Sequence, residues 1–305
     1  MRDRPYVVGS VPYANAIPLV AWFEELGDDS PVKVVYDIPS KLPALLDSGQ
    51  ADAILVSSID ALRVPGRRMA EGVCIGSHGP VKSVRLFSKV PPSYIRSIAL
   101  DQSSMTSNRL AMIILSELHG ASPQSVLAPP NQAEMLRDND ACLLIGDIGM
   151  TAPSEGLHVL DLGEQWQRLT NRPFVWAAWI GNESLTPELS LHLRTASLMS
   201  FAGRNLNEDA SKARRELLAS RRWYKPPSTT DFDAFKKNAR EKIIKKGLSK
   251  ASWTEAMLTD YFFNVMVYEM DDFVLEGLRT FQSLLLKHGD SDCTSFPHLV
   301  RPGPP

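Results

Sequence analysis

The chain has 305 residues, of which 44% are apolar and 22% are charged, as is typical of a globular protein with a buried core. This length exceeds one typical domain, so we expect two lobes or one large domain. The net charge is −2 and the isoelectric point is near 6.3, so no overall positive field favours nucleic acid or an anionic membrane as a partner. No stretch approaches the ~20 apolar residues that a transmembrane helix needs.

The N-terminal residues and the cysteines both favour the cytoplasm. Residues 1–5 lead straight into a strand-like run and contain no apolar region of a signal peptide. Cys74, Cys142 and Cys293 are far apart and odd in number, so their spacing predicts neither a disulfide framework nor a zinc site. We therefore expect buried, reduced thiols in a cytoplasmic protein.

The first hundred residues alternate between strand and helix patterns. Apolar and β-branched runs predict strands at 6–10, 32–37, 53–57 and 84–88. Helical patterns occupy 16–26 and 40–46, the second capped by Ser40 and ended by Gly49. Such alternation is typical of an α/β fold with a mostly parallel sheet covered by helices.

A second unit of the same kind follows Pro91 and Pro92. The pattern predicts strand-like runs at 98–101, 141–147, 159–162 and 174–180, and a strong helix at 108–118. The last of these runs is long enough to carry the chain back to the first unit. We therefore expect a discontinuous first lobe, residues 1–88 and 176–289, and a second lobe, residues 89–175.

The region from Thr186 to Gly289 is predicted to be almost entirely helical. Within it, residues 212–250 carry 13 Lys and Arg against 4 Asp and Glu. A basic segment occurs in nucleic-acid-binding proteins, but the acidic isoelectric point favours the solvated face of amphipathic helices. Residues 290–305 are rich in Pro and Ser, which predicts a disordered tail.

The sequence lacks the motifs of several common enzyme classes. It contains no GxSxG, HExxH, Walker A or GxGxxG pattern. Its six histidines are scattered, without the spacing of metal ligands. We therefore expect no metal site and no cofactor.

Four clusters of small polar residues form the strongest functional feature. They lie at predicted strand ends or helix starts, at 10–19, 57–58, 76–84 and 103–107. Ligands of open α/β sheets bind where such loops converge, and a helix N-terminus offers free N–H groups to a carboxylate. Serine and threonine also cap helices without any ligand, and Asp147 fits a cap as well as a pocket. Asn15 is the residue least easily explained as a cap.

Three of these segments resemble the chorismate dehydratases of the futalosine route to menaquinone. They read SVPYANAIPL at 10–19, GPVKSV at 79–84 and LDQSSMTSNRL at 100–110, and residues 261–281 fit the same family. The resemblance covers about residues 5–288. Ala14 departs from the bulkier apolar residue common in the family, which implies a change in the pocket wall alone.

The resemblance implies a type II periplasmic-binding-protein fold, an α/β fold of two lobes with a ligand cleft between them. It implies crossing strands at 84–88 and 174–178, and a cofactor-free lyase that removes water from chorismate to give 3-[(1-carboxyvinyl)oxy]benzoate. Asn15 and Ser83 are the implied catalytic residues. The implied substrate-binding residues are Ser10, Tyr13, Ser57, Ser104, Thr106, Ser107 and Asp147.

The expected partner is chorismate, without nucleic acid or membrane, and the expected state is a monomer or weak homodimer. Two alternatives stay open. A small-anion solute- or effector-binding protein of the same fold needs the same ligand donors without turnover. The related dihydroxynaphthoate synthase shares the fold but opens with a different motif.

The sequence does not identify the base of the implied reaction. Removing the proton beside the ether of chorismate places charge on the ring carboxylate, which Thr106, Ser107 and their helix N-terminus are expected to stabilise. Asn15 and Ser83 do not ionise near pH 7. The enolpyruvyl carboxylate of the substrate, Asp147 and His78 are therefore the candidates, although the two side chains are more often structural.

Overall fold

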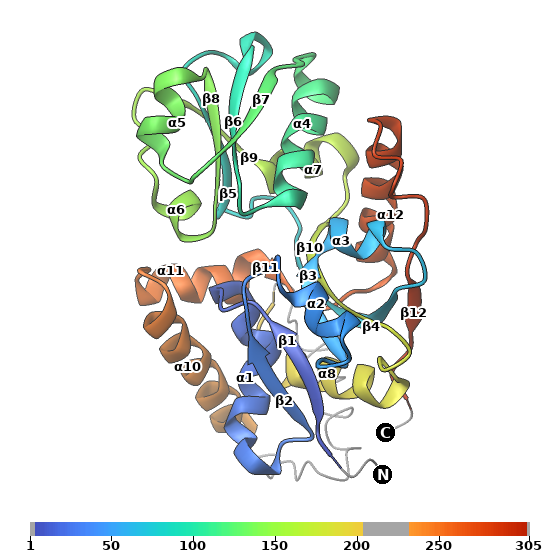
Figure 1. Ribbon diagram of the computed structural model, residues 1–305. Helices are drawn as coiled ribbons and strands as arrows, with labels where there is room; N and C mark the ends of the chain where they lie inside the picture. The colour runs from blue at the N-terminus through green and yellow to red at the C-terminus, as the bar shows by residue number, and fades with distance from the viewer. Residues whose placement is uncertain (1–3, 204–231, 304–305) are drawn as a thin grey trace.

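The computed structural model describes residues 4–203 and 232–303, which form two α/β lobes, each around its own sheet (Figure 1). The seven-stranded sheet of the first lobe has the order β11-β4-β10-β3-β1-β2, and β12 also pairs with β4. Its strands are β1 (Tyr6–Ser10), β2 (Val32–Tyr36), β3 (Ala53–Ser57), β4 (Arg68–Ser77), β10 (Phe174–Gly181), β11 (Met266–Val267) and β12 (His298–Val300).

Helices cover this first sheet. They are α1 (Ile17–Leu26), α2 (Leu42–Asp47), α3 (Ser58–Arg63), α8 (Pro187–Met199), α10 (Phe232–Lys250), α11 (Glu255–Asp260) and α12 (Asp272–Lys287). Short 3-10 turns occupy Ala14–Ala16 and Gly27–Asp29, and a π-helical turn, Tyr261–Val265, follows α11.

The second lobe contains a five-stranded sheet with the order β7-β6-β8-β5-β9. Its strands are β5 (Val84–Ser88), β6 (Ser97–Asp101), β7 (Gln124–Ala128), β8 (Ala141–Ile145) and β9 (His158–Asp161). Its helices are α4 (Met105–His119), α5 (Gln132–Asp138), α6 (Gly146–Thr151) and α7 (Leu162–Thr170), with a 3-10 turn at Pro92–Tyr94.

Both sheets are mixed, with as many antiparallel as parallel pairings, whereas the alternation of strands and helices predicts a mostly parallel sheet. β1 pairs in parallel with β2 and β3, and β6 pairs in parallel with β7 and β8. In the first sheet, β10 runs antiparallel to β3 and β4, and β11 runs antiparallel to β4. In the second sheet, β5 runs antiparallel to β8 and β9. The carboxyl ends of the parallel strands therefore gather at one edge of each sheet, where ligand-binding loops emerge in such folds.

The chain crosses between the lobes in two short segments, residues 78–83 and 171–173. β5 pairs with β8 and β9, so the first crossing lies before residue 84 and not after residue 88, where the expected boundary falls. After the second crossing, β10 begins at Phe174, two residues before the expected boundary at 176. Periodicity identifies these strands but not their sheet, because their pairing partners are distant in sequence.

Two glycines allow both crossings to pack closely against neighbouring helices. A Cβ atom on Gly163 of α7 would lie 2.4 Å from the carbonyl oxygen of Gly79 in the first crossing. A Cβ atom on Gly277 of α12 would lie 2.0 Å from the carbonyl oxygen of Pro173 in the second. Only glycine permits such a close approach of two backbones.

An aromatic cluster fills the core beside the second crossing. The ring centroids of Trp166 and Phe174 are 5.1 Å apart, and those of Phe174 and Phe281 are 4.9 Å apart, in edge-to-face geometry. These rings come from α7, β10 and α12, so elements of both lobes share one apolar core. Edge-to-face ring pairs add to the stabilisation from burial.

Some helix and strand limits differ from their sequence patterns. α4 begins at Met105, three residues before the expected start, because Ser104 Oγ accepts the Ser107 N–H at 3.2 Å and caps the helix. α2 begins at Leu42 without a side-chain cap, so Ser40 does not cap it. β7 lacks an alternating pattern because nearly all of its residues are exposed.

Residues 290–303 pack against the first lobe, in contrast to the disordered tail that their composition predicts. β12 pairs in parallel with residues 68–70 of β4, and Cys293 is completely buried. The unpaired edge of β4 supplies backbone partners that composition does not reveal. In the part of the chain that the structure describes, no helix is long and apolar enough to cross a membrane.

Candidate functional site

The two lobes meet where β3 and β6 end. Ile59, in the first turn of α3, donates its backbone N–H to Thr106 Oγ1, in the first turn of α4, at 3.1 Å. Both residues are buried. Tyr13 of the first lobe lies close by. Its pKa is raised, first by burial and second by the negative charge of Asp101, the last residue of β6. The loops after β1, β3 and β6 therefore form one junction.

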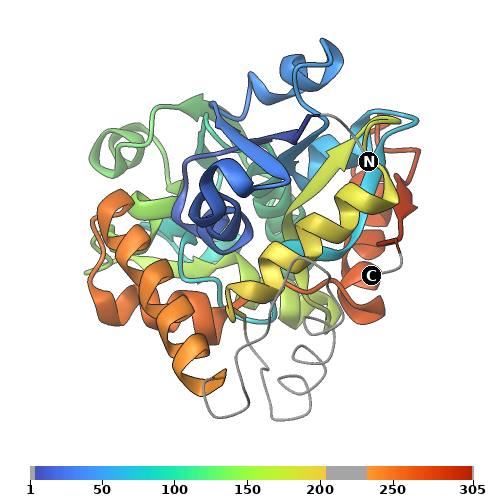
Figure 2. The ribbon, with the colours of Figure 1, turned by 90° about the horizontal axis from the view of Figure 1, so that it is seen from below.

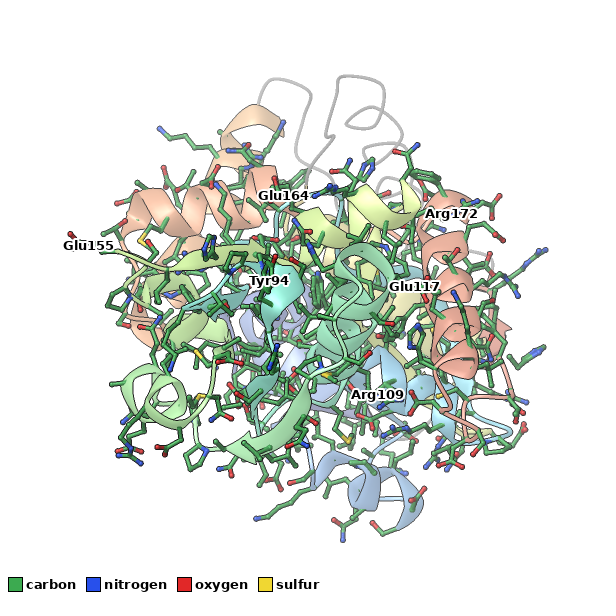
Figure 3. The ribbon with its side chains drawn as sticks, turned by 90° about the horizontal axis from the view of Figure 1, so that it is seen from above. Tyr94, Arg109, Glu117, Glu155, Glu164 and Arg172 are labelled. Atoms are coloured by element: carbon green, nitrogen blue, oxygen red, sulfur yellow. The ribbon has the colours of Figure 1, made fainter. Side chains whose placement is uncertain are left out.

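Charged residues hold α4 of the second lobe to the first lobe beside this junction. Asp290, after α12, accepts hydrogen bonds from Arg63 at 3.2 Å and from Arg109 Nε at 2.7 Å. Near the end of α4, Glu117 accepts from Lys287 of α12 at 2.7 Å. Figure 3 shows Arg109 and Glu117 on α4, on the side of α12. These contacts tie the C-terminal residues to both lobes.

The loop after β1 carries three of the predicted site residues. Ser10 is completely buried, and its hydroxyl donates to the carbonyl oxygen of Val11 at 3.3 Å. Tyr13 is 42% exposed. Asn15 lies in the 3-10 turn, and its buried Oδ1 atom has no hydrogen-bond partner among residues 4–203 and 232–303. In this loop, Asn15 Oδ1 is therefore the atom best suited to accept a hydrogen bond from a ligand.

The loop after β3 contains two serines with different surroundings. Ser57 Oγ donates to Asp60 Oδ2 at 2.8 Å. Ser58 is completely buried, and its Oγ atom has no hydrogen-bond partner in the part of the chain that the structure describes. Burial raises the pKa of Asp60, while the hydrogen bond from Ser57 and the charge of Arg63 act in the opposite direction. The predicted binding residue, Ser57, is therefore occupied by an interaction within its own helix turn.

Ser104, Thr106 and Ser107, three of the predicted substrate-binding residues, lie at the start of α4. Ser104 acts as the helix cap, and Thr106 and Ser107 are buried. In the same turn, the amide Nδ2 of Asn108 donates to the carbonyl oxygen of Asp101 at 2.9 Å, and its Oδ1 has no partner. A 15-residue helix begins here, and its dipole favours an anion at this end.

Ser83 lies in a second group of residues, at the first crossing. Its Oγ atom and the hydroxyl of Tyr261 share a hydrogen bond of 3.0 Å, and both side chains are buried. Burial raises the pKa of Tyr261 to about 12, and the negative charge of Asp147 contributes to this shift. Burial also raises the pKa of Asp147, and a hydrogen bond from the backbone of Ser252, which acts to lower this pKa, offsets the rise only in part. Asp147 thus lies near the pair of hydroxyls.

The backbone beside Ser83 is held in an uncommon conformation. Lys82 has a φ of 64°, in the left-handed region that residues other than glycine rarely adopt. The N–H groups of Val81 and Lys82 donate to the carboxylate of Asp161, at 2.9 and 2.6 Å. The Lys82 ammonium also pairs with Asp260, the residue before Tyr261. Strained backbone that is over-determined in this way is frequent at functional sites.

The remaining candidates lie elsewhere or make other contacts. The ring of His78 packs edge-on against Phe273, with centroids 5.5 Å apart. Among residues 4–203 and 232–303, no group of three or more His, Cys, Asp or Glu is arranged to hold a metal ion. The three cysteines are free and buried.

The basic segment falls partly outside the described residues, because 212–231 are not among them. Its remainder forms α10, which lies beside α1 in the view from below (Figure 2). Lys242 pairs with Glu25 at 2.8 Å, and the Lys250 ammonium lies 4.3 Å from the centroid of the Tyr36 ring. A hollow of about 480 Å³ between α10 and α11 contains none of the predicted site residues. These lysines therefore face acidic and aromatic residues of their own lobe.

Sequence reasoning missed Tyr261 and Asp60, and within the cluster at 57–58 it chose Ser57 over Ser58. Tyr261 lies in a segment that fits the family, yet no local pattern pairs it with Ser83, 178 residues away. Ser58 is indistinguishable from Ser57 by type, because only the fold decides which hydroxyl is satisfied. Asp60 was detectable, since a serine followed three residues later by an acid is a helix-start pattern.

Two α/β lobes joined by two crossings, with polar loops of both lobes at the junction, define the class of two-lobed proteins with a periplasmic-binding-protein fold. The chain is similar to protein AF1704 from Archaeoglobus fulgidus, with a TM-score of 0.62 and 16% identity over 95% of this chain and 99% of that chain. It is similar to the periplasmic aliphatic sulphonate binding protein SsuA from Escherichia coli, with a TM-score of 0.57 and 14% identity over 97% and 96%. These similarities confirm the predicted fold.

The chain belongs to the menaquinone biosynthesis family, whose model matches residues 6–287. A curated relative from Thermus thermophilus, named chorismate dehydratase, is 31% identical over an alignment of 206 residues. The match covers 62% of this chain and 74% of the relative. The family that the three sequence motifs predict is thereby confirmed.

Proposed function

We propose that the protein is a chorismate dehydratase, a cofactor-free lyase that removes water from chorismate to give 3-[(1-carboxyvinyl)oxy]benzoate. The observation that carries the proposal is the hydrogen bond between Ile59 and Thr106, because it sets the polar cluster at 103–107 against the loops after β1 and β3. The name of the curated relative supports the same activity.

The reaction suits a site built of polar residues without a metal. The carboxylate on the ring acidifies the proton beside the ether, through the ring double bond. Removal of that proton places charge on the ring carboxylate, and departure of the hydroxyl as water completes a benzene ring. Aromatisation drives the reaction, so the protein has mainly to position the substrate and stabilise charge.

The ring carboxylate binds, in this proposal, at the start of α4. Ser107 gives its backbone N–H to Ser104, so the donors assigned to the substrate are the hydroxyls of Thr106 and Ser107. Thr106 Oγ1 accepts from Ile59 and keeps its own hydrogen to donate. The helix dipole adds to the stabilisation of the negative charge that develops there.

The substrate itself supplies the base in this proposal. Asn15 and Ser83, the proposed catalytic residues, do not ionise near pH 7. The enolpyruvyl carboxylate takes the proton, and Asn15 orients that group through its buried amide. Asp147 is the competing base, since burial raises its pKa and thus its basicity. Turnover retained in Asp147→Asn supports the substrate as base, and loss of turnover with unchanged folding assigns the base to Asp147.

The test of the activity is direct. The purified protein is incubated with chorismate, and the aromatic product is followed by ultraviolet absorbance and mass spectrometry. We expect a product lighter than chorismate by one molecule of water. Chorismate that is bound but recovered unchanged contradicts the proposal.

A small-anion-binding protein of the same fold is the second candidate. Its specific support is the similarity to SsuA, which is named as a sulphonate-binding protein. Binding of chorismate without any turnover favours this candidate. Dihydroxynaphthoate synthase, the third, has the same fold but a different opening motif from residues 10–19.

We also propose that the protein works in the cytoplasm as a monomer or weak homodimer, with chorismate as its partner and without nucleic acid or membrane. Support for a reducing compartment comes from the three cysteines, which are free and buried. Sedimentation at micromolar concentration tests the oligomeric state, and a stable larger assembly contradicts it.

A further inference from the structure

Ser58 carries a hydroxyl that nothing in the described chain satisfies. Its side chain is completely buried, and Oγ has no hydrogen-bond partner. Burying a hydroxyl without a partner is unfavourable, so buried polar groups in proteins are nearly always hydrogen-bonded. The exception at Ser58 is explained if its partner is a ligand.

The position of Ser58 places that ligand at the junction of the lobes. Ser58 is the first residue of α3, directly before Ile59, whose N–H reaches Thr106 of the second lobe at 3.1 Å. The hydroxyl of the preceding Ser57 is already held by Asp60 at 2.8 Å. Of these two serines, Ser58 is the one whose hydroxyl lacks a partner.

Two further oxygens around the same junction also lack partners. Asn15 Oδ1 lies in the loop after β1, the strand that pairs with β3. Asn108 Oδ1 lies two residues after Thr106, and its orientation is set because Nδ2 donates to the carbonyl oxygen of Asp101. Both atoms are acceptors, so they require donors such as hydroxyl groups. Ser58, in contrast, has a hydrogen to donate.

We propose that Ser58, rather than Ser57, is the substrate-binding serine of the first lobe, and that it donates to a carboxylate of a ligand that also carries a hydroxyl. That hydroxyl donates to one of the two amide oxygens, Asn15 Oδ1 or Asn108 Oδ1. The ligand class is thus a hydroxy acid. The choice of chorismate as this ligand rests on the proposed function, whereas the role of Ser58 does not.

Ser197 provides a matched control. Like Ser58, it is buried, and its Oγ has no partner. It lies in α8, which packs against α1 and β4 within the first lobe. Ser58→Ala and Ser197→Ala therefore remove the same unsatisfied group, one at the junction and one away from it.

The experiment measures turnover of chorismate and calorimetric binding of shikimate, a ring hydroxy acid, and of its methyl ester. A hydrogen bond from a hydroxyl to a carboxylate contributes about tenfold or more to affinity. We expect Ser58→Ala to raise the KM for chorismate and the Kd for shikimate about tenfold, with little effect on the ester. Ser197→Ala is expected to leave both constants within about twofold. Neither change is expected to lower the melting temperature, because no protein hydrogen bond is lost.

Unchanged constants in Ser58→Ala overturn the proposal, and so does a fall in its melting temperature that Ser197→Ala does not show. If the unaltered protein does not convert chorismate, the proposed function fails, and shikimate binding still decides the role of Ser58. If shikimate does not bind but chorismate is converted, the KM of Ser58→Ala for chorismate decides the role of Ser58.

Discussion

Ser83 Oγ and the hydroxyl of Tyr261 lie 3.0 Å apart, both buried, although 178 residues separate them in the chain. Ser83 belongs to the first crossing between the lobes, and Tyr261 opens the π-helical turn after α11. π-helical turns are rare in proteins, and many of those that occur lie at functional sites. The pair therefore links the backbone between the lobes to the C-terminal part of the first lobe.

We expect Tyr261→Phe to lower kcat for chorismate about tenfold while KM changes little, because Ser83 loses the group that fixes the direction of its hydroxyl. Tyr268→Phe is the control, since Tyr268 is also buried but its hydroxyl has no hydrogen-bond partner among the described residues. Steady-state kinetics of both variants is the measurement. Equal kinetics in the two variants contradict a positioning role for Tyr261.

Thr106→Val is expected to lower the melting temperature and Thr106→Ser to preserve it. Valine leaves the buried N–H of Ile59 without an acceptor, at a cost of about 1–3 kcal/mol. Serine retains the oxygen that accepts this hydrogen bond. Differential scanning calorimetry of the two variants measures the effect, and a valine variant as stable as the unaltered protein means that Ile59 finds another acceptor.

Asn15→Ala is expected to lower kcat on the order of a hundredfold, because the enolpyruvyl carboxylate loses the group that orients it as the base. Stability is expected to change little, because Asn15 Oδ1 makes no hydrogen bond in the described chain. Kinetics and thermal unfolding on the same preparation measure both quantities. A variant with normal specific activity and a collapsed melting temperature makes Asn15 a structural residue.

Asp60→Asn is expected to stabilise the protein at pH 7.5 by about 2 °C, with a smaller gain near pH 4. Burial raises the pKa of Asp60 in the folded state. A group with a raised folded pKa contributes stability below its unfolded pKa and loses it as the pH rises through the folded pKa. Asparagine stays neutral and can still accept from Ser57. Melting curves of Asp60→Asn and of the unaltered protein at both pH values are the test. A rise in melting temperature that is larger at pH 4 than at pH 7.5 contradicts the prediction.

Turnover is expected to be unaffected by EDTA and by the absence of any nucleotide, because the sequence carries no motif for a metal or a nucleotide. Activity is measured before and after dialysis against the chelator. Activity that disappears on dialysis and returns with zinc or magnesium refutes this prediction.

The sequence by itself determined the α/β class, eight of the strands and the segments that carry the site, whereas it did not predict β4, β7, β11 or β12. Local residue preferences decide these features: β-branched apolar runs form β1 and β3, and Ser104 caps α4. The motifs at 10–19, 79–84 and 100–110 were sufficient for the family, since each is a short continuous stretch.

Only the tertiary structure decided which of these residues meet and which of their polar atoms are satisfied. Ser57 and Ser58 are the same residue type in adjacent positions, yet one donates to Asp60 and the other is buried without a partner. The placement of β5 in the second sheet and of β12 against β4 likewise depends on partners far away in the chain. Hydrogen-bond satisfaction and sheet membership are properties of long-range contacts, and residue spacing along the sequence does not encode them.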